Sequence, residues 1–223
     1  MPTLAPPEPK VIECPETRPL LKGWSHALAA VAGVVLCPIL IALAPAGTRA
    51  PASVFGACVI ALFAISALYH RFDWGPRMAT VMQRLDHSMI FVFIAATYTP
   101  VAVVALPHSE GRFILTLVWA AAVSGVATHL LWPTAPRWLS AALYLAVGWA
   151  ALLVIVDIWR ELGVAGFILL VSGGLFHSIG AVVYARKRPD PWPRVFGFHE
   201  LFHLFVIAGV ACHYVMIAFF ALR

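Results

Sequence analysis

Seven apolar segments alternate with short polar stretches along the chain, and each has the length of a membrane-spanning helix. Proline, arginine and lysine gather in the stretches between them, most clearly from Arg71 to Arg84. Because bilayer hydrocarbon offers no partner for exposed backbone groups, each apolar segment is predicted to be an α-helix. The segments are Trp24–Ala44, Ala52–His70, Leu85–Leu106, Phe113–Trp132, Trp138–Asp157, Gly163–Tyr184 and His199–Leu222.

The composition places the chain among integral membrane proteins. Of its 223 residues, 62% are hydrophobic and 11% are charged, whereas a soluble domain carries about 25% charged residues. Seven spans of about 20 residues leave no room for a separate soluble domain. We therefore predict one all-α bundle over residues 23–223, preceded by a proline-rich cytoplasmic tail at residues 1–22. This excludes a soluble enzyme and a nucleic-acid-binding module.

The distribution of positive charge predicts how the bundle is oriented. Eleven of the 15 Lys and Arg residues fall in the tail and in the second, fourth and sixth loops, all on one side of a seven-helix arrangement. Cytoplasmic loops carry the excess of positive charge. The N-terminus is therefore expected in the cytoplasm and the C-terminus outside, which requires an odd number of spans.

Five polar side chains lie within the apolar segments near one membrane face. Ser66 and His70 are one turn apart at the end of the second segment, and Asp86 lies at the start of the third. His199 and His203 form a second one-turn pair at the start of the seventh segment. All five are expected at similar depth near the cytoplasmic face. Since ionisable groups inside a membrane are costly, this set is a candidate functional site.

Three imidazoles with a carboxylate nearby are typical of a zinc site. His70, His199 and His203 are the predicted ligands, and they leave the fourth tetrahedral position for water, as in catalytic zinc sites. Zinc lowers the pKa of such a water to about 7, so Asp86 is the predicted general base. Ser66 is predicted to support the site through a hydrogen bond or to stabilise a tetrahedral intermediate.

Other readings of these residues remain open. The same side chains can form a purely structural hydrogen-bond network. The segment His199-Glu200-x-x-His203 also matches the zinc-protease pattern in which the glutamate is the base, and Glu200 ranks below Asp86 in that role. A haem is disfavoured, because two histidines on one helix face cannot take opposite axial positions. The remaining intramembrane histidines are expected to be interhelical hydrogen-bond partners: His26, His129, His177 and His213.

The order of the polar motifs resembles the hemolysin III family, the bacterial branch of the progestin and adipoQ receptor superfamily. The resemblance covers nearly the whole chain. Its most specific parts are S-A-L-Y-H at Ser66–His70, L-D-H-S at Leu85–Ser88 and F-H-E-L-F-H at Phe198–His203.

This resemblance implies a seven-helix fold with a cytoplasmic N-terminus and an intramembrane zinc held by His70, His199 and His203. It also implies Asp86 near the zinc-bound water and Ser66 beside the site. Because the superfamily resembles transmembrane ceramidases in its zinc site, a lipid amide or ester hydrolase is the natural extrapolation. The expected location is the cell membrane, the inner membrane in a bacterium, with a membrane lipid as substrate or ligand.

Two non-enzymatic functions compete with the hydrolase. In the first, the protein is a membrane receptor or sensor in which zinc is a structural clamp between the second and seventh helices. In the second, it is a cytolytic or channel protein. No span carries a continuous line of polar residues, which disfavours a channel.

Overall fold

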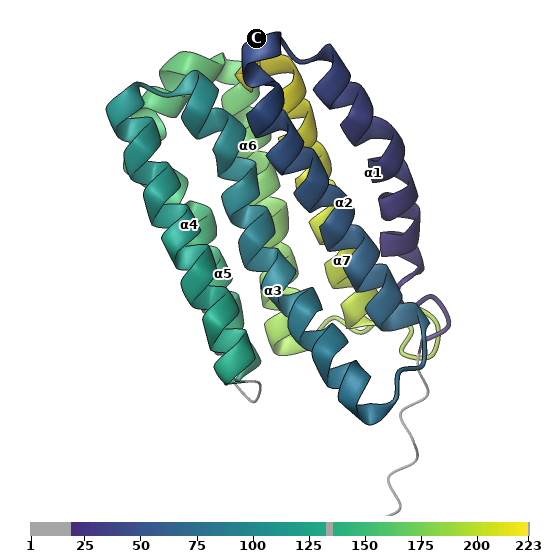
Figure 1. The fold of residues 1–223 in the computed structure, drawn as a ribbon. Coiled ribbons are helices and arrows are strands. Elements are labelled where there is room, and N and C mark those ends of the chain that lie inside the picture. Colours follow the sequence, from purple (N-terminus) through teal and green to yellow (C-terminus); the bar gives the residue numbers. More distant parts are fainter. Residues whose placement is uncertain (1–18, 133–135, 223) are drawn as a thin grey trace, which may run out of the picture.

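The computed structural model describes residues 19–132 and 136–222, and these residues form a bundle of long helices without a β-strand (Figure 1). The predicted tail lies mostly outside the described residues, since only residues 19–22 of it are included. The α-helices are α1 (Trp24–Leu43), α2 (Arg49–Arg71), α3 (Pro76–Pro100), α4 (His108–Leu131), α5 (Arg137–Gly148), α6 (Ile155–Arg186) and α7 (Phe198–Met216). A 3₁₀ segment at Trp149–Val154 continues α5, and π-helical segments at Val101–Ala105 and Ile217–Ala221 continue α3 and α7.

Six stretches of the described residues are long and apolar enough to cross a membrane. Five correspond to the predicted first four segments and the seventh. The predicted fifth and sixth segments are joined in one helical stretch of 49 residues, Trp138–Arg186. The all-helical membrane bundle is therefore confirmed, although the six stretches do not match the seven predicted segments one for one.

A sharp turn at Gly163 divides this long stretch. Gly163 has φ 64° and ψ −177°, and a positive φ of this kind favours glycine because it has no Cβ. The two arms lie side by side, since the indole Nε1 of Trp149 donates to the Ser178 hydroxyl at 3.0 Å. The expected loop between Asp157 and Gly163 is helical instead, because the intervening residues include no helix breaker.

Helix α3 begins nine residues earlier than predicted. Its first residue is Pro76, whose fixed φ and missing N–H suit the first helical position. The polar residues between Arg77 and Arg84 precede the apolar run, but none of them breaks a helix. The first two turns of α3 therefore carry polar residues that the hydropathy pattern assigned to a loop.

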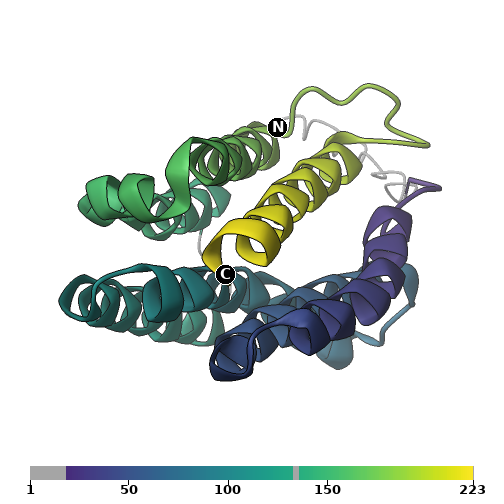
Figure 2. The same ribbon diagram turned by 90° about the horizontal axis from the view of Figure 1, so that it is seen from above.

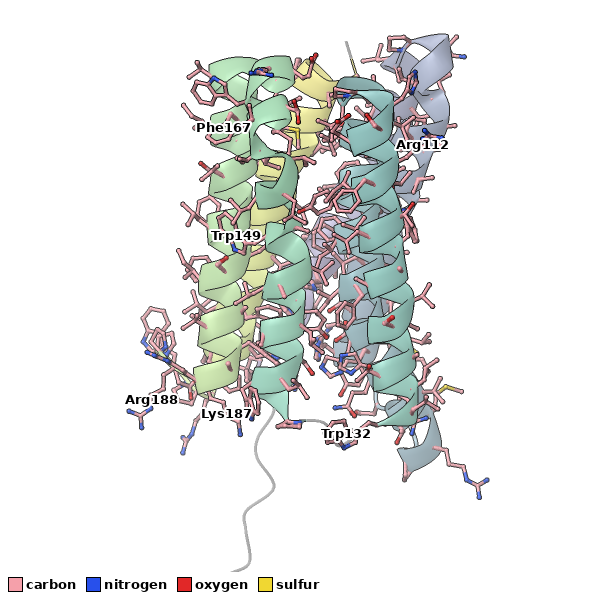
Figure 3. All side chains as sticks on the ribbon, turned by 90° about the vertical axis from the view of Figure 1, so that its left-hand side faces the viewer. Arg112, Trp132, Trp149, Phe167, Lys187 and Arg188 are labelled. Carbon is pink, nitrogen blue, oxygen red and sulfur yellow. The ribbon has the colours of Figure 1, made fainter. Side chains whose placement is uncertain are left out.

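Helix α7 runs through the middle of the bundle, between α6 on one side and α1 and α2 on the other (Figure 2). Large apolar side chains that the bundle does not bury point outwards around it, as expected for a surface in contact with lipid (Figure 3). The most enclosed large side chains are Phe55, Phe91, Ile114, Ile158, Met216 and Ile217. Helix α7 also carries buried polar side chains at Glu200, His203 and His213, so it can contribute to an internal site.

Close packing of α4 on the π-helical segment Val101–Ala105, which follows α3, gives a prediction about stability. A Cβ at Gly111 would clash with the backbone carbonyl oxygen of Ala102, whereas a Cβ at Gly148 would meet open space. We expect Gly111→Ala to lower the melting temperature, because overpacking costs about 1–3 kcal/mol. Gly148→Ala is the matched control and should leave the melting temperature unchanged or raise it, because alanine favours helix. Equal melting temperatures for both variants in detergent would contradict this packing.

Candidate metal centre

Three histidines converge where the end of α2 meets the start of α7. The Nε2 atoms of His70 and His199 are 3.0 Å apart. His203, one turn further along α7, completes a group whose ligand atoms all lie within 4.8 Å of one another. His70 and His203 are buried, with 7% and 1% of their surface exposed. The one-turn spacing of the α7 pair directs both rings towards α2, as the sequence predicts.

Asp86 and Ser66 lie beside these histidines. The Asp86 carboxylate oxygen Oδ2 is 3.8 Å from Nε2 of His70. Ser66, one turn before His70 on α2, is 2% exposed and also faces the Asp86 carboxyl group. The structure therefore brings together all five residues singled out from the sequence, drawn from α2, α3 and α7.

His26 on α1 is a neighbour of the histidine cluster, although its sequence context predicts only an interhelical hydrogen bond. Its Nδ1 lies 2.8 Å from the Ser66 hydroxyl, which agrees with that expectation. Its ring also stacks on His203 with a centroid distance of 3.7 Å and an interplanar angle of 16°. The signal in the sequence was the Ser25-His26 pair at the start of the first helix. We infer that His26 orients the side chains of His203 and Ser66 through these two contacts.

The donor set fits a metal ion. Three nitrogens that bind one Zn²⁺ at about 2.0–2.1 Å lie within about 4 Å of one another. Small rotations of the three side chains would therefore bring their nitrogens to the distances of a zinc site. Nδ1 of His203 is buried and has no hydrogen-bond partner among the described residues. Within the part of the chain that the structure describes, this is the one group of three histidine, cysteine or acidic side chains arranged for a metal.

Glu200 makes a hydrogen bond to the backbone and is not a member of the histidine cluster. Its Oε2 accepts a hydrogen bond from the backbone N–H of Gly197 at 2.8 Å. This is the capping-box arrangement, in which the side chain three residues into a helix satisfies a free backbone donor before it. The residue is 1% exposed. Glu200 thus fixes the start of the helix that carries two of the three histidines.

A pair of substitutions tests this role of Glu200. Glu200→Ala removes the cap and should lower the melting temperature, because a lost cap costs about 0.5–2 kcal/mol. Glu200→Gln keeps an acceptor for the Gly197 N–H and should stay close to wild type. Thermal unfolding in detergent measures both variants, and a Gln variant as unstable as the Ala variant would show that the carboxylate charge, not the cap, is needed.

An apolar cavity leads away from the cluster into the bundle. Asp86 and His199 line it at one end, and Val101, Ile158 and His213 line it at the other. Most of the remaining lining is aliphatic or aromatic. This lining suits an apolar group whose polar end lies at the histidines.

A second set of histidine and tyrosine contacts ties four helices together next to this cavity. Nε2 of His87 on α3 lies 3.2 Å from the Tyr184 hydroxyl on α6. Nε2 of His129 on α4 lies 2.9 Å from the Tyr144 hydroxyl on α5, which in turn donates to the His87 carbonyl at 3.2 Å. His129 is therefore the interhelical partner predicted from the sequence, whereas the network around His87 was not foreseen.

Comparison with known proteins gives a consistent result. The family model described as "Haemolysin-III related" matches residues 15–214. The chain is 28% identical to Hemolysin-3 of Bacillus cereus over 202 residues, which cover 89% of each protein. It is 29% identical to the Hemolysin-3 homolog of Bacillus subtilis over 171 residues, 77% of each. It is also 32% identical to the heptahelical transmembrane protein ADIPOR2 of Oryza sativa over 185 residues, 76% of this chain and 81% of that protein.

Proposed function

We propose, from the premise that this chain belongs to the haemolysin-III related family within the progestin and adipoQ receptor superfamily, that it is a zinc-dependent hydrolase of membrane lipids. The family and the six apolar stretches make it a multi-pass protein of the cell membrane. The observation that carries the hydrolase proposal is the position of the three clustered histidines at the end of an apolar cavity.

The proposed topology has seven crossings with a cytoplasmic N-terminus. The turn at Gly163 allows the 49-residue stretch to cross twice, which adds one crossing to the six apolar stretches. The contact between His70 and His199 requires the end of α2 and the start of α7 to lie at the same face. An odd number of crossings then agrees with the excess of Lys and Arg on the N-terminal side.

His70, His199 and His203 would hold the ion in this proposal. When bound, zinc supplies Lewis-acid polarisation of a carbonyl group and makes water a nucleophile near neutral pH. Asp86 is placed to accept the proton of the attacking water and to return it to the departing amine or alcohol of the lipid. Ser66, oriented by its bond to His26, is placed to donate a hydrogen bond to the developing oxyanion.

The remaining residues of the cavity would bind the lipid. Its aliphatic and aromatic lining accepts an acyl chain and excludes water from the reacting bond. The substrate class is therefore a membrane lipid with an amide- or ester-linked acyl chain.

Release of fatty acid tests the proposal. Purified protein in detergent would be supplied with zinc and incubated with a ceramide and, separately, with a phospholipid. We expect free fatty acid from one of the two and none after the metal is removed with a chelator. A zinc-loaded, folded protein that releases no fatty acid from either lipid would contradict the hydrolase.

A second candidate function is a receptor or sensor in which the metal is a clamp. The contact between His70 and His199 joins helices separated by 129 positions in the sequence, and this favours a structural contribution. A clamp predicts that His70→Ala lowers the melting temperature in a protein that never turns over a lipid. Turnover by the wild type decides in favour of the hydrolase.

A further inference from the structure

A second pair of histidines lies deeper in the bundle, between α6 and α7. His177 on α6 packs its ring against Gly209 on α7, and His213 on α7 packs its ring against Gly173 on α6. A Cβ on either glycine would clash with the ring that lies on it. The two ring centroids are 5.4 Å apart. Each helix thus carries a glycine that makes room for the histidine of the other.

Both rings carry a buried nitrogen without a hydrogen-bond partner. Nε2 of His177 and Nδ1 of His213 have none among the described residues. The other ring nitrogen of His213 lies 3.4 Å from the Leu170 carbonyl oxygen. Both nitrogens are covered as the rings lie, and Nε2 of His177 points towards Gly209. Because an unpaired polar atom in an apolar interior is destabilising, a ring rotation that brought either nitrogen to a polar group of another molecule would be favourable.

The two histidines face the same apolar cavity as the candidate metal centre. Both line it, together with Asp86 and His199 at its other end. Along the axis of α7, His213 lies about 15 Å from His203, and Gly209, on which the His177 ring packs, lies about 9 Å from it. Half of the bilayer hydrocarbon, the depth that one acyl chain occupies, is also about 15 Å. The pair therefore lies where the far end of an acyl chain would be if its carbonyl group were at the metal centre.

We infer that His177 and His213 form a second polar subsite, which binds a hydroxyl or carbonyl group near the far end of a lipid chain held in the cavity. The ligand class is an acyl lipid with a second hydrogen-bonding group on its chain. An imidazole ring in its neutral form offers both a donor and an acceptor, and a hydroxyl group can pair with either. The subsite rests on the proposed placement of a lipid chain in this cavity, but it does not depend on hydrolysis.

Binding of two matched fatty acids tests the subsite. Dodecanoic acid and ω-hydroxydodecanoic acid, whose extended chain matches this span, would each displace a fluorescent fatty acid from the purified protein, with partition into protein-free micelles measured separately. A hydroxyl buried without a partner weakens binding, whereas one hydrogen bond strengthens it. After correction for partition, we expect the wild type to bind the hydroxy acid about three- to tenfold more tightly.

Variants test whether His177 and His213 cause the preference for the hydroxy acid. His177→Phe combined with His213→Phe keeps a ring against each glycine but removes the nitrogens, so the preference should reverse. His177→Gln retains a hydrogen-bonding group and should keep part of it. Ser178→Ala is the matched control, because the Ser178 hydroxyl already donates to Gly174 and accepts from Trp149. The melting temperature without ligand verifies that each variant is folded.

Three results would overturn the subsite. Equal or weaker binding of the hydroxy acid by the wild type would show that the two nitrogens accept no ligand group, and an ordered water would then satisfy them. An unchanged preference in the double phenylalanine variant would place the hydroxyl elsewhere. If neither acid binds, the cavity does not hold a lipid chain, and the acyl-chain part of the proposed function is wrong as well. Loss of turnover with an intact hydroxyl preference would, in contrast, affect the hydrolase alone.

Discussion

Replacing His203 with alanine is expected to abolish zinc binding by the purified protein, whereas the wild type should hold about one ion per chain. The substitution leaves two imidazole ligands of the three, too few for a tetrahedral site with one open position. His203 is the most buried of the three, with 1% of its surface exposed, so no side chain from the surface can replace it. Elemental analysis of protein washed free of loose metal measures the effect.

His213→Ala is the matched control for this experiment. It makes the same substitution on the same helix, ten residues further on, at a side chain outside the histidine group. The control should retain zinc. Zinc bound as firmly by His203→Ala as by the wild type would show that the ion lies elsewhere, and loss of zinc from both variants would point to a general collapse of α7.

Asp86→Asn is expected to reduce lipid hydrolysis by about 10²- to 10⁴-fold, the range usual for loss of general acid–base catalysis. Zinc content should stay at the wild-type level, because the proposed ligands are histidines and the carboxylate oxygen lies 3.8 Å from Nε2 of His70. The amide keeps the shape of the side chain but cannot accept the proton of water. Initial rates of fatty-acid release and elemental analysis of the same sample measure both effects.

Asp157→Asn provides the control at a second acidic residue. Asp157 lies near the turn of the α5–α6 stretch and is 4.0 Å from the Arg160 guanidinium, in a pair exposed enough to contribute little. Its substitution should change neither rate nor zinc content. If Asp86→Asn loses zinc together with activity, the carboxylate is a metal ligand; if it retains full activity, another residue handles the proton.

The sequence predicted the bundle and the convergence of the polar residues for clear physical reasons. A membrane-spanning helix must be continuous and apolar, so hydropathy locates it well. The one-turn spacing of His199 and His203 places both on one helix face, and alternation of the helices brings His70 to the same end of the bundle. The contact of 3.0 Å between His70 and His199 agrees with that prediction.

The features that were missed depend on packing rather than on hydropathy. The turn at Gly163 and the early start of α3 at Pro76 involve polar residues near a membrane face, where hydropathy does not distinguish a helix from a loop. The stacking of His26 on His203 and the reciprocal packing of His177 and His213 on glycines require knowledge of which helices are neighbours. One sequence does not contain that information in its periodicity.

A single uninterrupted helix, α7, carries both His203 and His213, so the distance between these two residues is fixed. The spacing between the two polar ends of the cavity is fixed by the rise of that helix and not by the loops, which vary most readily in evolution. If the proposed lipid binding holds, a relative for longer or shorter chains would have one of these histidines moved by a whole turn, a step of about 5.4 Å. Chain-length selection within such proteins would therefore change in discrete increments.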